Sequence, residues 1–277
     1  TVLSLNPEIA NADTIHPGVE LKLPGASREV LGGYAEAELQ AAMLAEMLEQ
    51  SEEKRKAAEP FSTLMVQTQF SYSAWQGVDT RDNTTATLLS RTNAGAQITW
   101  TQNWNACWKT FQSVGFTRYE IAPDTGSNLP IRNATLWAPR YTLGGIYSPH
   151  DGMELGALVG YSQQLYYHSE TAVLGVTLDG LMAPVMEIWW GQRLLKLKPF
   201  DVRAELRVLS VLPVSNSAYS THFGLGYRAR IEIGQTFQAM RVFAGGGFTY
   251  LNQNSSILQL NRRDIGFEVG IQWRLGK

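Results

Sequence analysis

The last fourteen residues, 264–277, contain the most regular pattern in the chain. From Ile265 to Leu275 every second residue is apolar, and the residues between them are glycine, glutamine, glutamate or arginine. Because a β-strand has a two-residue period, one face of this strand is apolar and the other carries groups that are costly to bury unpaired. A strand of a soluble sandwich can alternate in this way but usually runs shorter. A transmembrane barrel strand, with its apolar face toward lipid and its polar face toward the lumen, fits the pattern better.

Nine more alternating runs lie between Phe61 and Tyr250. Long connections are expected at 79–85, 122–130, 168–184, 213–220 and 252–263, and tight ones at 103–106, 148–152, 196–201 and 234–236. An even strand number, with tight turns on one side and long loops on the other, is typical of outer-membrane barrels. The sequence therefore predicts a mainly β protein, with a ten-stranded antiparallel transmembrane β-barrel over residues 61–277.

The faces predicted to point inward collect arginine and glutamate. They hold Arg140, Glu154, Glu187, Arg193, Arg203, Glu205, Arg207, Arg228, Arg230, Glu232, Arg241, Glu268 and Arg274. A ten-stranded barrel is only slightly wider than the eight-stranded kind that side chains fill, so these groups are expected to pair and plug the lumen. The alternative is a narrow cationic pore for anions.

The N-terminal region has a different composition. Residues 1–60 hold 5 basic and 11 acidic residues, against 18 and 14 in the remainder. After a linker at 27–33, segment 34–59 consists of strong helix formers and predicts an amphipathic helix that stops before Pro60. Its apolar stripe is Leu39, Met43, Leu44, Met47 and Leu48. Two interpretations stay open: packing against the chain's own barrel or linker, and self-association or docking on a partner of the cell envelope.

Residues 1–26 carry a dense motif. It consists of Asn6-Pro7-x-Ile9, Asn11-x-Asp13-x-Ile15, Pro17-Gly18 and Leu21-x-Leu23-Pro24. This motif resembles the second half of a LysM domain, a small glycan-binding module with a β-α-α-β fold, and its first strand and first helix are missing. The resemblance implies that Asn11, Asp13, Thr14 and Ile15 line a groove for N-acetylglucosamine-containing chains, here peptidoglycan. The alternative is a helix–turn–strand linker.

The closing strand, with Trp273 and Leu275, resembles the aromatic-rich C-terminal strand of bacterial outer-membrane proteins, although Gly276-Lys277 follow it. This resemblance implies the outer membrane of a Gram-negative bacterium. The order of strands then puts the N-terminal region on the tight-turn, periplasmic side, where peptidoglycan lies. If the protein is exported, its signal has been removed or lies upstream of Thr1.

The sequence offers little for catalysis. The single cysteine, Cys107, excludes an internal disulfide and a multi-cysteine metal site, and no cluster of metal ligands or glycine-rich phosphate loop is present. Some ten-stranded outer-membrane barrels are proteases with carboxylates and histidines at the extracellular rim, but His168 and His222 show no recognisable acid–histidine spacing. We expect no catalytic residue, no cofactor and no nucleic-acid partner. The prediction is a non-enzymatic tether between the outer membrane and peptidoglycan, with a small pore or transporter as the alternative and a hydrolase behind it.

Overall fold

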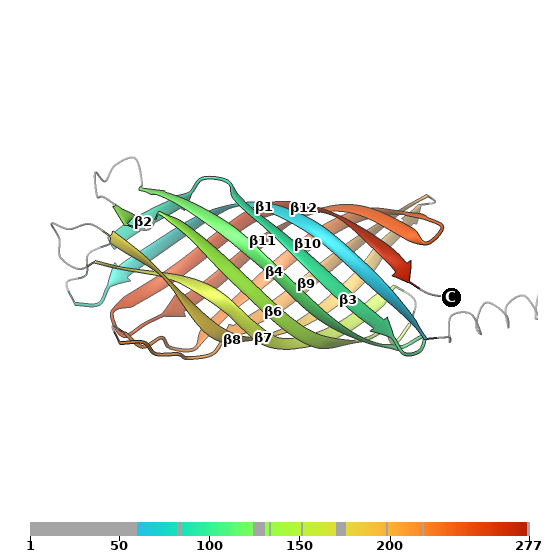
Figure 1. The fold of residues 1–277 in the computed structure, drawn as a ribbon, viewed down its shortest axis with the longest axis horizontal. Helices are drawn as coiled ribbons and strands as arrows, with labels where there is room; N and C mark the ends of the chain where they lie inside the picture. The colour runs from blue at the N-terminus through green and yellow to red at the C-terminus, as the bar shows by residue number, and fades with distance from the viewer. Residues whose placement is uncertain are drawn as a thin grey trace, which may run out of the picture. The chain divides into compact units, whose positions relative to one another are not determined.

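The computed structural model describes residues 60–275 except 82, 84, 124–130, 133, 151, 170–175, 198 and 218. The predicted LysM-like segment, linker and helix lie outside the described residues. The described part is built from antiparallel strands (Figure 1). They are β1 (Phe61–Asp79), β2 (Thr85–Ser90), β3 (Asn93–Asn103), β4 (Trp108–Pro123), β5 (Ile131–Arg132), β6 (Thr135–Tyr147), β7 (Met153–Ser169), β8 (Val176–Leu197), β9 (Phe200–Val211), β10 (Gly224–Phe237), β11 (Met240–Asn254) and β12 (Leu258–Leu275).

The sheet closes on itself because β12 pairs with β1 along its whole length, from Ser62↔Leu275 to Asp79↔Leu258. Strands β3 and β2 pair with successive parts of β1 and both also pair with β4, so they occupy one position in the ring. Strand β5 adds only a two-residue parallel pairing with β8. Eleven strands therefore close the ring and fill ten positions. The predicted closed antiparallel barrel is confirmed, and its ten strands correspond to ten positions rather than to ten separate strands.

The two ends of the barrel differ. Strand β1 starts and β12 stops at the same end, where tight connections also join β3 to β4, β6 to β7, β8 to β9 and β10 to β11 (Figure 1). We call this the short-turn end and the opposite one the loop end. Two predicted loops at the loop end are wrong. Residues 168–184 belong largely to β7 and β8, and residues 252–263 belong largely to β11 and β12, with only Ser255–Ile257 between those strands.

The outer surface is apolar. On β12, Ile265, Phe267 and Val269 are 65%, 57% and 43% exposed, while their neighbours Gly266 and Glu268 face inward. Exposed aromatic residues border this band on both sides. Trp100, Trp104, Trp108, Tyr147 and Trp190 lie toward the short-turn end, and Tyr72, Phe116, Trp137, Tyr161 and Tyr227 lie toward the loop end. An apolar band between two aromatic girdles is the lipid-facing surface of a transmembrane barrel.

The wall is longer than a bilayer requires. Strand β1 has 19 residues and β8 has 22, whereas a tilted strand crosses the hydrocarbon core with about 9–11 residues. The excess lies at the loop end, because the apolar band starts close to the short turns. Among the described residues, no helix is long and apolar enough to cross a membrane.

The lipid-facing position of the band predicts a depth-dependent effect of charge. Val269→Arg should lower the free energy of unfolding in lipid vesicles by about 2–4 kcal/mol, because a guanidinium would stand in the hydrocarbon core. Gln259→Arg is the matched control, since Gln259 is exposed on the same strand and face but beyond the band. Urea titration followed by tryptophan fluorescence measures both. Equal effects at the two positions would contradict this placement of the band.

Candidate functional site

Strands β7 and β8 leave the barrel wall together. Pairing of β7 with β6 ends at Arg140↔Ser162, and pairing of β8 with β9 ends at Val185↔Val211. The two strands nevertheless continue to pair with each other as far as Ser169↔Val176. Residues 163–169 and 176–184 thus form a two-stranded ribbon without neighbours in the ring. We call this ribbon the capping hairpin.

The capping hairpin crosses the mouth at the loop end. The Tyr167 hydroxyl donates to the carbonyl of Ala86 in β2 at 2.8 Å, and a Cβ added at Gly77 in β1 would overlap that hydroxyl. On the other side, Tyr166 packs against Tyr219 with ring centroids 5.6 Å apart, and its hydroxyl accepts a hydrogen bond from Gln253 in β11. Strands β2 and β11 lie far from β7 and β8 around the ring, so the hairpin spans the opening between them.

An apolar cluster surrounds the capping hairpin and fills the loop end. It consists of Trp75, Leu88, Tyr119, Ile121, Ala138, Leu165, Tyr166, Tyr167, Val176, Leu178, Tyr219, Leu258 and Leu260. Each of these side chains is buried. Leu165 and Leu178 are buried even though, nearer the short-turn end, residues of the same parity on β7 and β8 face outward. The described residues therefore form a packed apolar layer at this mouth, and such a layer excludes water and ions.

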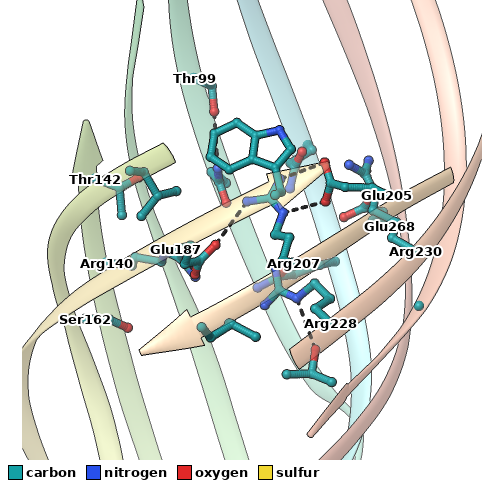
Figure 2. A pocket seen from close by; sticks show the side chains of 18 of the residues that line it. Thr99, Arg140, Thr142, Ser162, Glu187, Glu205, Arg207, Arg228, Arg230 and Glu268 are labelled. Carbon is teal, nitrogen blue, oxygen red and sulfur yellow. Dashed lines mark hydrogen bonds and ion pairs between the residues drawn. The ribbon is translucent and has the colours of Figure 1, made fainter. Parts of the chain in front are cut away.

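A layer of charged side chains lines the lumen (Figure 2). At its centre the Glu187 carboxylate accepts from Arg140 at 2.6 Å and from Arg207 at 3.1 Å. Arg207 also donates two hydrogen bonds to Glu205, at 2.5 and 2.9 Å, and its guanidinium carbon lies 4.7 Å from the ring centroid of Trp189. The Glu187 side chain is only 2% exposed, so both its oxygens depend on these arginines.

A second group of ion pairs continues toward the short-turn end. Arg241 bridges Glu232 at 2.6 Å and Asp201 at 3.0 Å, and Arg203 also reaches Asp201 at 3.0 Å. Arg230 contacts both Glu232 and Glu268. Across the lumen Lys109 pairs with Glu154 at 2.7 Å. These pairs come from six different strands, so they join distant parts of the wall.

The structure thus brings most of the predicted lumen residues into ion pairs. Arg274 is an exception: it is exposed at the rim, where its guanidinium carbon lies 4.0 Å from the ring centroid of Phe61. Arg193 lies near the short turns, where its backbone N–H donates to the Gly152 carbonyl at 2.6 Å. The proposed LysM-like groove residues and the predicted helix face are outside the described range.

Sequence reasoning missed several members of the lumen set: Lys109, Asp201, Arg262 and Asp264. On β9, Asp201 has the parity of Arg203, Glu205 and Arg207, and this parity is the signal that could have found it. The prediction assigns no inward residue to the run at 108–120, so no such signal was available for Lys109. Arg262 and Asp264 are in step with Glu268, but Arg262 falls within the connection predicted at 252–263 and Asp264 is the first residue of the stretch predicted as the last strand. The Arg262 guanidinium pairs with Asp264 at 2.8 Å and lies 5.0 Å from the ring centroid of Tyr119, directly beneath the apolar cluster.

The lumen retains a cavity of about 400 Å³ below the capping hairpin. Its lining is mostly polar and extends from Gln164 and Arg262 near the hairpin to Asn103, Lys109 and Glu154 near the short turns. In the part of the chain that the structure describes, no three His, Cys, Asp or Glu residues gather as a metal site. The polar lining of the cavity, which includes several arginines, can form hydrogen bonds with a polar organic molecule or an anion.

The closed ring, the apolar outer band between aromatic girdles and the charged lumen define a transmembrane β-barrel protein. No family model and no curated protein matches the chain. Among solved structures, the translocator domain of the autotransporter NalP from Neisseria meningitidis is 13% identical, with 87% of this chain and 98% of that chain covered and a TM-score of 0.43.

Two other solved outer-membrane proteins are similar to the chain. The protease OmpT from Escherichia coli is 8% identical, with 79% of this chain and 97% of that chain covered and a TM-score of 0.45. Ail, the attachment invasion locus protein of Yersinia pestis, is 10% identical, with 76% of this chain and 98% of that chain covered and a TM-score of 0.27. With such low identities and TM-scores, the class assignment rests on the barrel's own geometry.

Proposed function

We propose that this protein is a non-enzymatic anchor in the outer membrane of a Gram-negative bacterium and that its N-terminal region binds peptidoglycan. The observation that carries the proposal is the packed apolar cluster at the loop end. A barrel whose mouth is filled by the capping hairpin, above a layer of paired charges, is built to hold its place in lipid rather than to conduct solutes. The function would then belong to the N-terminal region that the barrel anchors.

The site of attachment supports the same proposal. The described chain enters the barrel at Phe61, at the short-turn end, beside the end of β12. In an outer-membrane barrel the short turns face the periplasm. Residues 1–26, with their LysM-like motif, would then emerge on the side where peptidoglycan lies. Segment 34–59 would span the interval between the two, and its apolar stripe would bind a second copy or an envelope protein.

Sedimentation with purified peptidoglycan tests the proposal. The full chain in detergent should co-sediment with peptidoglycan, and a variant with Asp13→Ala, Thr14→Ala and Ile15→Ala should lose most of this binding, because these residues would form the glycan groove. A matched variant with Ser27→Ala, Arg28→Ala and Glu29→Ala changes three residues of the predicted linker and should co-sediment as before. Retention of the groove variant equal to that of the full chain would contradict the tether.

A further inference from the structure

Arg228 differs from the other arginines in the charged layer. Its Nε donates to the Thr249 hydroxyl at 3.1 Å, and within the described residues it forms no ion pair. Its two terminal amino groups have no hydrogen-bond partner among those residues and are not buried. Because Arg228 lines the cavity, these groups open into it.

The neighbouring carboxylates are already engaged. Both oxygens of Glu187 are bonded, one to Arg140 and one to Arg207. Both oxygens of Glu205 are bonded to Arg207. The carboxylates of Glu232 and Glu268 contact Arg230, and Glu232 also contacts Arg241. The protein therefore supplies Arg228 with nearby negative charge but with no carboxylate of its own.

The register puts Arg228 in an unfavourable position. Arg228 and Arg207 are direct partners across β9 and β10, and both side chains point into the lumen (Figure 2). Like charges directly opposite each other on two strands destabilise the pairing. A bound anion between the guanidinium groups would remove this repulsion, and a carboxylate would satisfy the free donor pair of Arg228 in two-pronged geometry.

We propose that the lumen binds a small polyhydroxylated carboxylate, with its carboxylate on Arg228. The rest of the cavity carries hydroxyl and amide groups, among them Ser162, Gln163 and Gln164, which suit the hydroxyl groups of such a molecule better than an apolar body. A volume of about 400 Å³ is at the small end of ligand sites and fits one sugar-acid-sized molecule. Since the capping hairpin seals the loop end, the ligand enters from the short-turn end. This site is independent of the proposed peptidoglycan binding.

Isothermal titration calorimetry of the full chain in detergent tests the site, with sodium gluconate as the probe and sorbitol as its neutral counterpart. The wild type should bind one gluconate per chain and no sorbitol. Arg228→Gln should weaken gluconate binding by about tenfold or more, because a charge-assisted bidentate contact is lost. Arg118→Gln is the matched control, since Arg118 is exposed on the outer face of β4. The Arg118→Gln variant should bind gluconate as tightly as the wild type.

A second measurement separates the loss of the site from a loss of the fold. Without ligand, Arg228→Gln should unfold at a higher urea concentration than the wild type, because the repulsion with Arg207 is gone, while it no longer responds to gluconate. The proposal is overturned by a wild type that does not bind gluconate, by equal binding of gluconate and sorbitol, or by an Arg228→Gln variant that binds as tightly as the wild type.

Discussion

Cutting back the capping hairpin should give the barrel an ion conductance that we expect the wild type to lack. Gln164 and Leu181 are paired across the hairpin, so replacing residues 165–180 by Asn-Gly joins them through a two-residue turn that suits antiparallel strands. The replacement removes Tyr166, Tyr167 and Leu178 from the apolar cluster and leaves the polar cavity open at the loop end. Current steps in planar lipid bilayers are the measurement: we expect none for the wild type and discrete steps for the variant.

A matched variant changes only the residues that connect the two strands of the hairpin in the sequence. Replacing only residues 170–175 by Asn-Gly keeps both strands of the capping hairpin and the buried tyrosines, so this variant should stay silent. Folding of both variants is checked by the heat-dependent shift of their mobility in gels. A wild type that conducts, or a folded shortened variant that does not, would contradict the interpretation of the capping hairpin as a seal.

The barrel itself could be predicted because lipid acts on every strand in the same way. An outward-facing residue in the apolar band contacts lipid and is therefore apolar. Ile265, Phe267 and Val269 accordingly repeat with the two-residue period of the strand. The positions of the turns then follow from the lengths of the runs. The same rule assigned the inward parity of Arg140, Glu187 and Arg207, which the structure places in contact.

The capping hairpin could not be predicted by that rule, because it leaves the lipid-facing wall. Leu165, Tyr166 and Tyr167 are consecutive, and all three are buried, since both faces of the ribbon pack against other parts of the loop end. A strand buried on both faces has a continuous apolar run instead of alternation. The sequence predicts a connection at 168–184, which leaves out the last two residues of β7 and the first nine of β8.

The sequence also could not predict which charged side chains pair with each other. Parity says that Arg207 and Glu187 face the lumen, but the register of β8 against β9 decides which groups meet. That register sets Trp189 opposite Arg207 and leaves Glu187 within reach of an arginine from β6. It equally sets Arg228 opposite Arg207, a like-charge pairing that no pattern of single strands reveals. Alternation thus predicts which residues face the lumen but not which of them interact there.

Glu187→Met should be among the most destabilising single substitutions in the lumen. The change leaves Arg140 without the carboxylate that it contacts at 2.6 Å, whereas Arg207 keeps both bonds to Glu205. Leaving a buried charge unpaired costs about 3–5 kcal/mol, and we expect about 3 kcal/mol because the Arg140 side chain is 25% exposed and stays partly hydrated. Urea unfolding in lipid vesicles measures the loss. Glu120→Met is the control: its partners Arg91 and Arg118 are 72% and 47% exposed, so the expected loss is under about 1 kcal/mol.

The double variant Glu187→Met with Arg140→Met shows whether the loss comes from the orphaned charge or from the missing carboxylate itself. Removing both partners of a buried pair is often nearly neutral, because neither group then has to be desolvated alone. The double variant should therefore recover most of the stability that the single variant loses, a coupling that a double-mutant cycle measures directly. A double variant as unstable as Glu187→Met would mean that Arg207 also depends on Glu187, despite its bonds to Glu205. A single variant no less stable than Glu120→Met would mean that water in the cavity already hydrates Arg140, so the charged layer would add polarity to the lumen but little rigidity.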